Sequence, residues 1–317
     1  MQIDLSWKVA TKNLLRNQRR SLSTAMALIS GLIGMVLLSA YVFRVHKGLE
    51  VSTVYINHKG HVALFKKDSL SSYYTRPSKF MLVGEEKAQA ITLLRDFDKE
   101  IEFTGEYMSG QGLLSNGEKS IPFAGLGVEP KVYYQVASNP QITVWAKDWV
   151  HGRFLSSAKM FSENPNSVSI TPNVAELIGR KVPFDNLSED QRSVQLAGQS
   201  VFGDLNAVDA DLGPIHSTGV AMAEDSSIIV GLSRLQELYA SDGIQYLAVF
   251  LKQGSDTSGV YKKIKRIIAD QNLNLEVYPY YDAVWGAYYR GSMSFLMVMG
   301  GFFMVLICAG VALSIIN

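Results

Sequence analysis

Two long apolar runs, one near each end of the chain, set its organisation. Residues 21–43 contain no Asp, Glu, Lys or Arg, and neither do residues 291–317. A run of about 20 mostly apolar residues is long enough to cross the hydrocarbon core of a membrane as a helix. The pattern therefore predicts two transmembrane helices, 21–43 and 291–317, on either side of a water-exposed segment, 44–290.

Shorter patterns within 44–290 predict a mixture of helices and strands. Residues 55–67 have strand character around Val62, Leu64 and Phe65. Residues 102–128 predict paired strands joined at Asn116-Gly117, because this dipeptide tolerates the positive φ of hairpin turns. Apolar spacing predicts helices at 84–97 and 173–178, strands at 246–251 and 275–278, and a helix between these two strands with Val260, Ile264, Ile267 and Ile268 on one face.

The order of these elements predicts a two-part domain. Strand, helix and strand elements recur at both ends of the segment, so 44–130 and 243–290 are expected to form one α+β subdomain. Residues 131–242 would be an inserted second subdomain. The predicted fold class is a membrane protein with two transmembrane α-helices flanking an α+β periplasmic domain.

Residues 1–20 predict a cytoplasmic amphipathic helix lying at the membrane surface. Trp7 suits the headgroup layer, and the basic residues fall elsewhere on the helical wheel. A simple basic flank is the alternative. A signal peptide would need a shorter apolar run and a small-residue cleavage site. Positive charge beside a membrane helix stays cytoplasmic, so the N-terminus is expected inside. The charges that set this topology are Lys8, Lys12, Arg16, Arg19 and Arg20.

An aromatic cluster precedes the second apolar run. Trp285, Tyr288 and Tyr289 lie next to Arg290, as is typical of anchors at the outer membrane interface. A core cluster or a ligand-stacking surface is the alternative for the same residues.

Composition narrows the function only slightly. The chain has 317 residues and a net charge of +1, which gives no reason to expect nucleic acid as a partner. Its single cysteine, Cys308, excludes a disulfide within the chain.

Catalytic and metal-binding patterns are weak. His58 and His61 have ligand-like spacing, but zinc needs three or four ligands, and a strand histidine beside a turn glycine is the favoured interpretation. Asp204, Asn206, Asp209 and Asp211 do not match a calcium-binding EF-hand loop and are interpreted as polar turn residues. The sequence has no P-loop pattern G-x-x-x-x-G-K-[ST] and no G-x-S-x-G pattern. We therefore expect no enzyme activity, no cofactor and no metal site in this chain.

Several short stretches, taken in order, resemble MacB/FtsX-type ABC transporter permeases, in the branch near the lipoprotein-releasing permeases. Part of the likeness lies in the basic amphipathic segment 7–20, which precedes the first membrane helix. It also lies in Gly60-His61-Val62, where a strand is expected to begin, and in 151–155, which resembles the family's G-R-x-L turn. The most specific stretch is 203–210, followed by Gly213 and by 217–219. Gly152, Gly203 and Gly213 are interpreted as turn residues, because glycine adopts positive φ at low cost. The residues that match the family pattern are Gly60, His61, Gly152, Arg153, Gly203, Asn206, Asp209, Gly213 and Gly219.

The resemblance implies a permease subunit in the bacterial inner membrane, with a large MacB-like periplasmic domain between its first two helices. Its expected partners are a cytoplasmic ABC ATPase, a second permease protomer as homodimer or heterodimer, membrane lipid, and a lipoprotein or other periplasmic partner. ATP hydrolysis by the ATPase would drive motion of the periplasmic domain, for export or release of lipoprotein, peptide or drug cargo.

The sequence departs from the family pattern in its number of membrane helices, and a different class of protein is the alternative to a permease. Such permeases have four membrane helices, so we expect this sequence to be the N-terminal part of a longer permease. The alternative is a membrane-anchored extracytoplasmic sensor or ligand-binding module whose signalling domain is missing.

Overall fold

The computed structural model describes residues 12, 18–146, 154–182, 184, 187–218 and 223–316. The chain divides into two compact units. The first combines Met1–Lys47 with Arg290–Asn317, and the second is Gly48–Tyr289. Each unit is described by itself.

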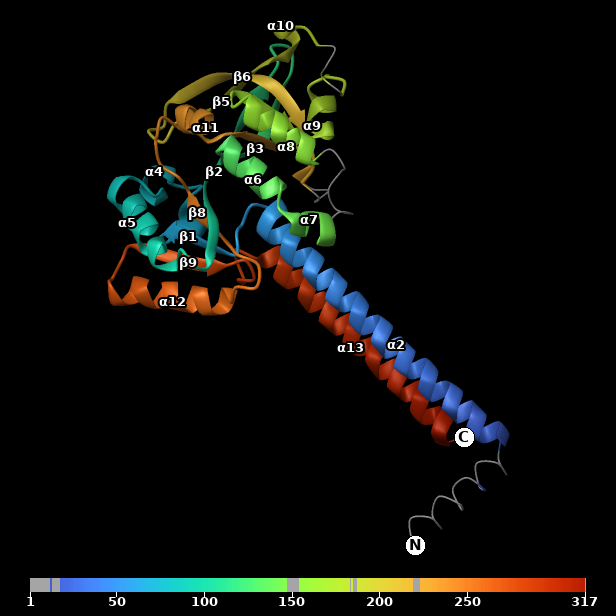
Figure 1. The fold of residues 1–317 in the computed structure, drawn as a ribbon. Helices are drawn as coiled ribbons and strands as arrows, with labels where there is room; N and C mark the ends of the chain where they lie inside the picture. Colours follow the sequence, from blue (N-terminus) through green and yellow to red (C-terminus); the bar gives the residue numbers. More distant parts are fainter. Residues whose placement is uncertain are drawn as a thin grey trace. The chain divides into compact units, whose positions relative to one another are not determined.

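Two long helices make up the described part of the first unit. Helices α2 (Gln18–Val51) and α13 (Ala287–Ile316) run past the bounds of that unit and lie side by side within it (Figure 1). Two helical segments are long and apolar enough to cross a membrane: Ser21–Ile56, which runs past the end of α2, and Ala287–Ser314 within α13. The helix predicted over 21–43 is therefore confirmed, but α2 extends beyond residue 43 through polar residues that the apolar pattern excluded.

The second unit begins with the end of α2 and the π-helical turn η1 (Ser52–Ile56), all of whose residues are buried. The strand predicted from residue 55 is wrong at this point. The β-branched and aromatic run Val54-Tyr55-Ile56 favours a strand locally. In the structure these residues continue the helix into the core, and the strand begins only at Val62.

The nine strands that the structure describes in this unit belong to one sheet, in the order β3-β7-β4-β6-β5-β2-β8-β1-β9. Strand β2 pairs with β8 through its first half and with β3 and β5 through its second half. Because β3 also pairs with β7, six strands form a closed ring, and β8, β1 and β9 extend from it. The strands are β1 (Val62–Lys66), β2 (Ile101–Ser115), β3 (Ser120–Val128), β4 (Ser167–Ile170), β5 (Ser193–Gln199), β6 (Leu205–Ile215), β7 (Ser227–Gly231), β8 (Tyr246–Leu251) and β9 (Leu275–Pro279).

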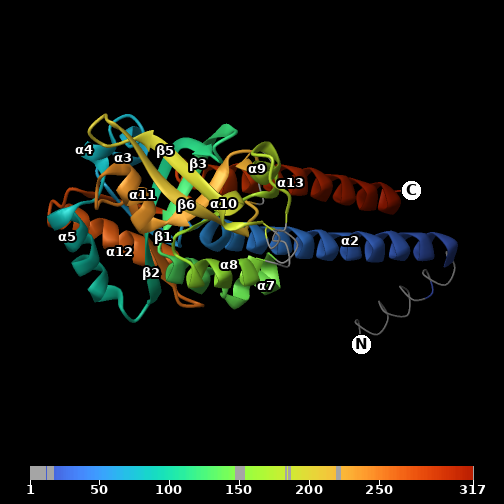
Figure 2. The same cartoon turned by 90° about the horizontal axis from the view of Figure 1, so that it is seen from above.

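Helices cover this sheet. Helix α12 packs along β9, α8 packs beside α6 and against β6, and α11 contacts the ring strands (Figure 1). The antiparallel ribbon of β5 and β6 is seen from above in Figure 2. The helices are α3 (Ser69–Ser72), α4 (Pro77–Phe80), α5 (Gly84–Leu94), the 3₁₀ turn η2 (Arg95–Phe97), α6 (Pro130–Ala137), α7 (Pro140–Trp145), α8 (Phe154–Glu163), α9 (Pro172–Leu177), α10 (Glu189–Arg192), α11 (Leu232–Tyr239) and α12 (Thr257–Asp270).

Burial explains why the strand sequences look so different. Strand β8, between β1 and β2, is buried at every position, and its sequence YLAVFL is correspondingly apolar throughout. Strand β6 alternates instead, with Val208, Ala210 and Leu212 buried and Asp209 and Asp211 exposed. One face of β6 therefore packs on the core while the other meets water.

Most predicted elements of the second unit are confirmed. The helices expected at 84–97 and 173–178, the strand at 246–251 and the helix–strand pair after it all appear within about two residues of their predicted bounds. The hairpin at 102–128 is also confirmed, but its turn differs from the expected one. Only Gly117 has positive φ, and the Asn116 side-chain oxygen accepts bonds from the backbone N–H groups of Glu118 and Lys119.

The division into subdomains 44–130 plus 243–290 and 131–242 stays a prediction. Strands from both parts lie in the single sheet, and β2 pairs with strands of each part.

Candidate functional site

The first candidate is the helix pair of the first unit. A Cβ atom at Gly31 of α2 would lie 2.5 Å from Cγ2 of Val311 on α13, so the helices approach closely at this glycine. Small residues permit such close packing of membrane helices. Large apolar side chains elsewhere on both helices are exposed, which suits a lipid environment or further helices.

Replacing Gly31 by leucine is expected to separate the two helices, with a cost of about 1–3 kcal/mol from overpacking. Thr24 Oγ1 donates a hydrogen bond to the Ser314 backbone oxygen at 3.5 Å, so cysteines at these positions can report on the approach. In a Cys308→Ser background, the yield of the Thr24→Cys/Ser314→Cys cross-link should fall in Gly31→Leu. Gly301→Leu is the matched control, because a Cβ at Gly301 meets nothing within 4 Å. Equal cross-linking in both variants would contradict the packing described here.

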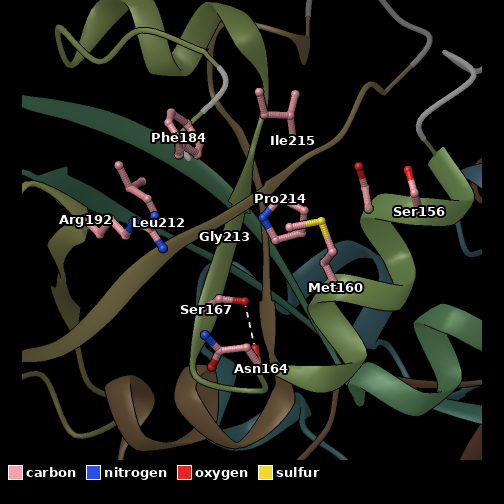
Figure 3. A pocket seen from close by; sticks show the side chains of 11 residues that line it. Ser156, Met160, Asn164, Ser167, Phe184, Arg192, Leu212, Gly213, Pro214 and Ile215 are labelled. Carbon is pink, nitrogen blue, oxygen red and sulfur yellow. Dashed lines mark hydrogen bonds between the residues drawn. The ribbon is translucent and has the colours of Figure 1, made fainter. Parts of the chain in front are cut away.

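The second candidate is a surface pocket of about 240 Å³ in the second unit (Figure 3). Helix α8 forms one wall with Ser156, Ser157 and Met160, and β6 faces it with the stretch 212–215. The remaining lining residues are Asn164, Ser167, Phe184 and Arg192.

The pocket combines apolar and polar side chains. Met160, Phe184 and Leu212 supply apolar walls, while Ser167 Oγ is used in a 2.7 Å bond to the Asn164 backbone oxygen. Arg192 places a guanidinium at the edge, where its Nε donates to the Leu187 backbone oxygen at 3.2 Å.

The third candidate is a cavity of about 260 Å³ lined by two buried histidines, His58 and His216. His58 follows η1, has φ of +54°, and is only 2% exposed. Its ring stacks on Tyr133 at 5.1 Å, and its Nδ1 lies 3.3 Å from the Tyr107 hydroxyl. Burial, with a smaller effect of His216, lowers the pKa of His58 to about 3.

His216 follows β6 and is bound on both ring nitrogens. Nδ1 lies 3.1 Å from Ser169 Oγ, and Nε2 lies 3.2 Å from Ser227 Oγ. Burial lowers the pKa of His216 to about 4, although the nearby Glu224 carboxylate acts in the opposite direction. Both rings are therefore neutral at neutral pH. The sequence analysis considers His58 only as part of a weak metal pattern, and nothing in the spacing of His58 and His216 along the chain indicates that they line one cavity.

The structure explains the glycine and the histidine of the predicted motif Gly60-His61 by their contacts with β8. Gly60 has φ of +67°, and a Cβ there would lie 2.9 Å from both the backbone N and O of Val249. His61 donates its backbone N–H to the Val249 oxygen at 2.8 Å, and its Nδ1 accepts the Leu251 N–H at 3.0 Å. These contacts fix the start of β1 against β8.

The 203–210 stretch also has a structural role, in a turn and in hydrogen bonds to neighbouring elements. Gly203, with φ of +97°, lies in the β5–β6 turn, so its interpretation as a turn residue is confirmed. Asn206 Nδ2 donates to the backbone oxygens of Glu237 and Leu238 at the end of α11, and Asp209 accepts from Gln195 across the ribbon.

Three interpretations need correction. Gly213 is not a turn residue: it lies within β6, where a Cβ would come 2.6 Å from Ser167 Oγ, so close packing explains the glycine. Asn206, Asp209 and Asp211 lie in strand β6 rather than in a turn, and the two aspartates are exposed. His58 and His61 precede β1 rather than lying in a strand. Within the described ranges, no three His, Cys, Asp or Glu side chains are grouped so that they could hold a metal ion.

The predicted interface aromatics have mixed environments. The Trp285 ring contacts Phe65 at 4.9 Å and Tyr246 at 5.0 Å, and Tyr289 is buried, whereas Tyr288 is 54% exposed. Their role as membrane anchors, together with Arg290, stays a prediction.

The structure describes only some of the residues that were predicted to set the membrane topology or to match the family pattern. Lys12 and Arg19 are exposed, and Arg20 lies in α2. The others lie outside the described residues: Trp7, Lys8, Arg16, Gly152, Arg153 and Gly219.

Comparisons with known proteins complete this picture. The comparison with protein-family models found no match, and neither did the comparison with curated proteins. Among solved structures, the chain is similar to the periplasmic region of MacB from Actinobacillus actinomycetemcomitans, with 11% identity and a TM-score of 0.44 over 69% of this chain and 87% of that chain. It is also similar to the extracellular domain of the noncanonic ABC-type transporter YknZ from Gram-positive bacteria, with 14% identity and a TM-score of 0.39 over 68% of this chain and 98% of that chain. The fold class is that of two candidate membrane helices flanking a mixed α/β domain.

Proposed function

We propose that the chain is a permease component of an ABC transporter. The observation that carries the proposal is the placement of two candidate membrane-spanning helices directly before and after one mixed α/β unit, Gly48–Tyr289. The ordered sequence motifs that resemble MacB/FtsX-type permeases support it.

In this proposal the basic N-terminal segment is cytoplasmic and the α/β unit lies outside the cytoplasmic membrane. A cytoplasmic ATPase hydrolyses ATP, and the permease, paired with a second protomer, passes the resulting motion to the α/β unit. That unit engages lipoprotein, peptide or drug cargo, or a protein that receives it.

Purification from native membranes tests this function. An affinity tag placed before Met1 on the chromosomal gene keeps the protein as its own gene encodes it. After gentle solubilisation, we expect a P-loop ATPase to co-purify in stoichiometric amount and the eluate to hydrolyse ATP. A mock purification from the untagged strain is the control. Recovery of a kinase or another signalling protein, with no ATPase, would contradict the permease and favour the sensor.

A further inference from the structure

Helix α12 carries its apolar and its charged residues on opposite faces. Val260, Ile264 and Ile268 are buried in the core that the sheet and its helices share. The rest of the helix has four cations against one carboxylate, Asp270. The cations are all exposed, and they are Lys262, Lys263, Lys265 and Arg266.

These four cations, which we call the basic face of α12, form a surface of like charge. None of them forms an ion pair with a carboxylate in the part of the chain that the structure describes, whereas Lys66 and Lys87 pair with glutamates at 2.9 and 2.7 Å. Lys265 approaches only the Tyr261 hydroxyl, at 3.3 Å. A surface of one sign that its own chain leaves unneutralised fits an anionic partner.

Helix α12 begins at the end of the sheet from which the chain enters α13. Strands β8 and β9 run parallel to each other on either side of β1, since Val249 and Pro279 both lie opposite Val62. Helix α12 connects these strands and runs the opposite way along β9, so its start lies at the end where β9 stops (Figure 1). Just beyond that end, the Tyr280 ring lies 5.0 Å from the ring of Tyr289 in the first turn of α13.

The basic face lies close to this start of α12. Its cations are five to nine residues from Thr257, which is about 8–14 Å along the helix axis. Helical side chains lean towards the N-terminus of their helix, and Lys and Arg carry their charges on long flexible stems, so both effects shorten the distance. Because the apolar span of α13 begins at Ala287, lipid headgroups are expected around its first turn.

We propose that the basic face of α12 docks on anionic phospholipid headgroups of the membrane that α13 enters. The docking is electrostatic, because the apolar face of α12 is buried in the core and does not insert into lipid. Anionic headgroups attract Lys and Arg within about a Debye length, roughly 8 Å at physiological salt. The inference requires that α13 crosses a membrane, but it is independent of the ATPase and the cargo proposed above.

Quenching of a fluorophore on α12 tests the docking. The full chain with Cys308→Ser and Ala269→Cys takes the fluorophore at an exposed position about one turn beyond Arg266. It is reconstituted into vesicles of phosphatidylcholine, with or without phosphatidylglycerol, that contain a lipid carrying a nitroxide quencher on its headgroup. We expect stronger quenching where phosphatidylglycerol is present. The increase should disappear at about 1 M salt, because the Debye length then falls to about 3 Å.

Two double variants decide the interpretation. Lys262→Gln/Arg266→Gln removes two cations that lie one turn apart on the side of α12 opposite its buried face. Each cation near an anionic surface strengthens association about fivefold, so the ratio of docked to undocked protein should fall about 25-fold. Lys119→Gln/Lys181→Gln is the matched control, because it removes the same charge from exposed positions near the β2–β3 turn, at the opposite end of β2 from its pairing with β8. It should leave the ratio unaltered.

Three results would overturn the proposal. Equal quenching in the two kinds of vesicle would leave an acidic protein surface as the partner of the basic face. An increase that survives at about 1 M salt would show that charge does not hold the helix on the lipid. An increase that the control pair lowers as much as the α12 pair would show that net charge decides, rather than α12. All four substituted side chains are exposed, so we expect both variants to fold.

Discussion

Lowering the pH from about 7 to about 5 is expected to reduce the free energy of unfolding of the second unit by about 4 kcal/mol. The effect comes from His58 and His216, whose pKa values burial lowers to about 3 and about 4. In the unfolded chain both would titrate near 6.5, so below that pH the unfolded state binds protons that the folded state refuses. Stability is therefore fully present above about pH 6.5 and is lost as the pH falls towards the folded pKa values.

The groups that face these rings do not cancel the effect. Tyr107 and Tyr133 stay neutral over this range, and the Glu224 carboxylate offsets only part of the burial of His216. A loss of about 4 kcal/mol is large against the 5–15 kcal/mol that typical domains have in total.

Urea unfolding of the full chain in a non-ionic maltoside, followed at several pH values, measures this dependence. His58→Phe should remove about half of the slope between pH 7 and 5, because one of the two titrating groups is gone. His46→Phe provides the comparison, since the structure places that histidine in α2 rather than beside the cavity. A flat profile from pH 7 to 5 in the unaltered chain would show that the two rings are accessible to protons in the folded state.

The sequence predicted elements whose signal is local. Helix α12 follows from Val260, Ile264 and Ile268, which recur at helical spacing and are all buried. Strand β8 follows from an uninterrupted apolar run, and the β2–β3 hairpin from Asn116-Gly117 between two strand-like stretches. In each of these elements the residues that decide the structure are close together in the chain.

Features that depend on distant residues could not be predicted. The ring closes because β3 pairs with β7 in parallel, and no local pattern specifies that partner. The histidine cavity brings together the segment after η1, β3 and the β6–β7 connection. At Val54-Tyr55-Ile56, strand propensity gave the wrong element because the preceding helix continues into the core.

Gly60→Ala is expected to destabilise the second unit by about 3 kcal/mol, the largest effect of a single methyl group that we predict. Two causes add. A residue with a side chain costs about 1–2 kcal/mol at a left-handed φ such as the +67° of Gly60. Its Cβ would also overlap the backbone of Val249, which cannot retreat because it pairs with β1 at Val62 and accepts the N–H of His61.

Gly254→Ala separates these two causes. Gly254 has φ of +87°, but a Cβ there meets nothing within 4 Å, so only the backbone strain of about 1–2 kcal/mol should appear. Urea midpoints of the two variants, measured at pH 8 where both buried histidines are neutral, give the comparison. If Gly60→Ala costs no more than Gly254→Ala, the start of β1 can move away from β8. The close approach of Gly60 to Val249 would then not be the contact that holds the segment between η1 and β1 in place.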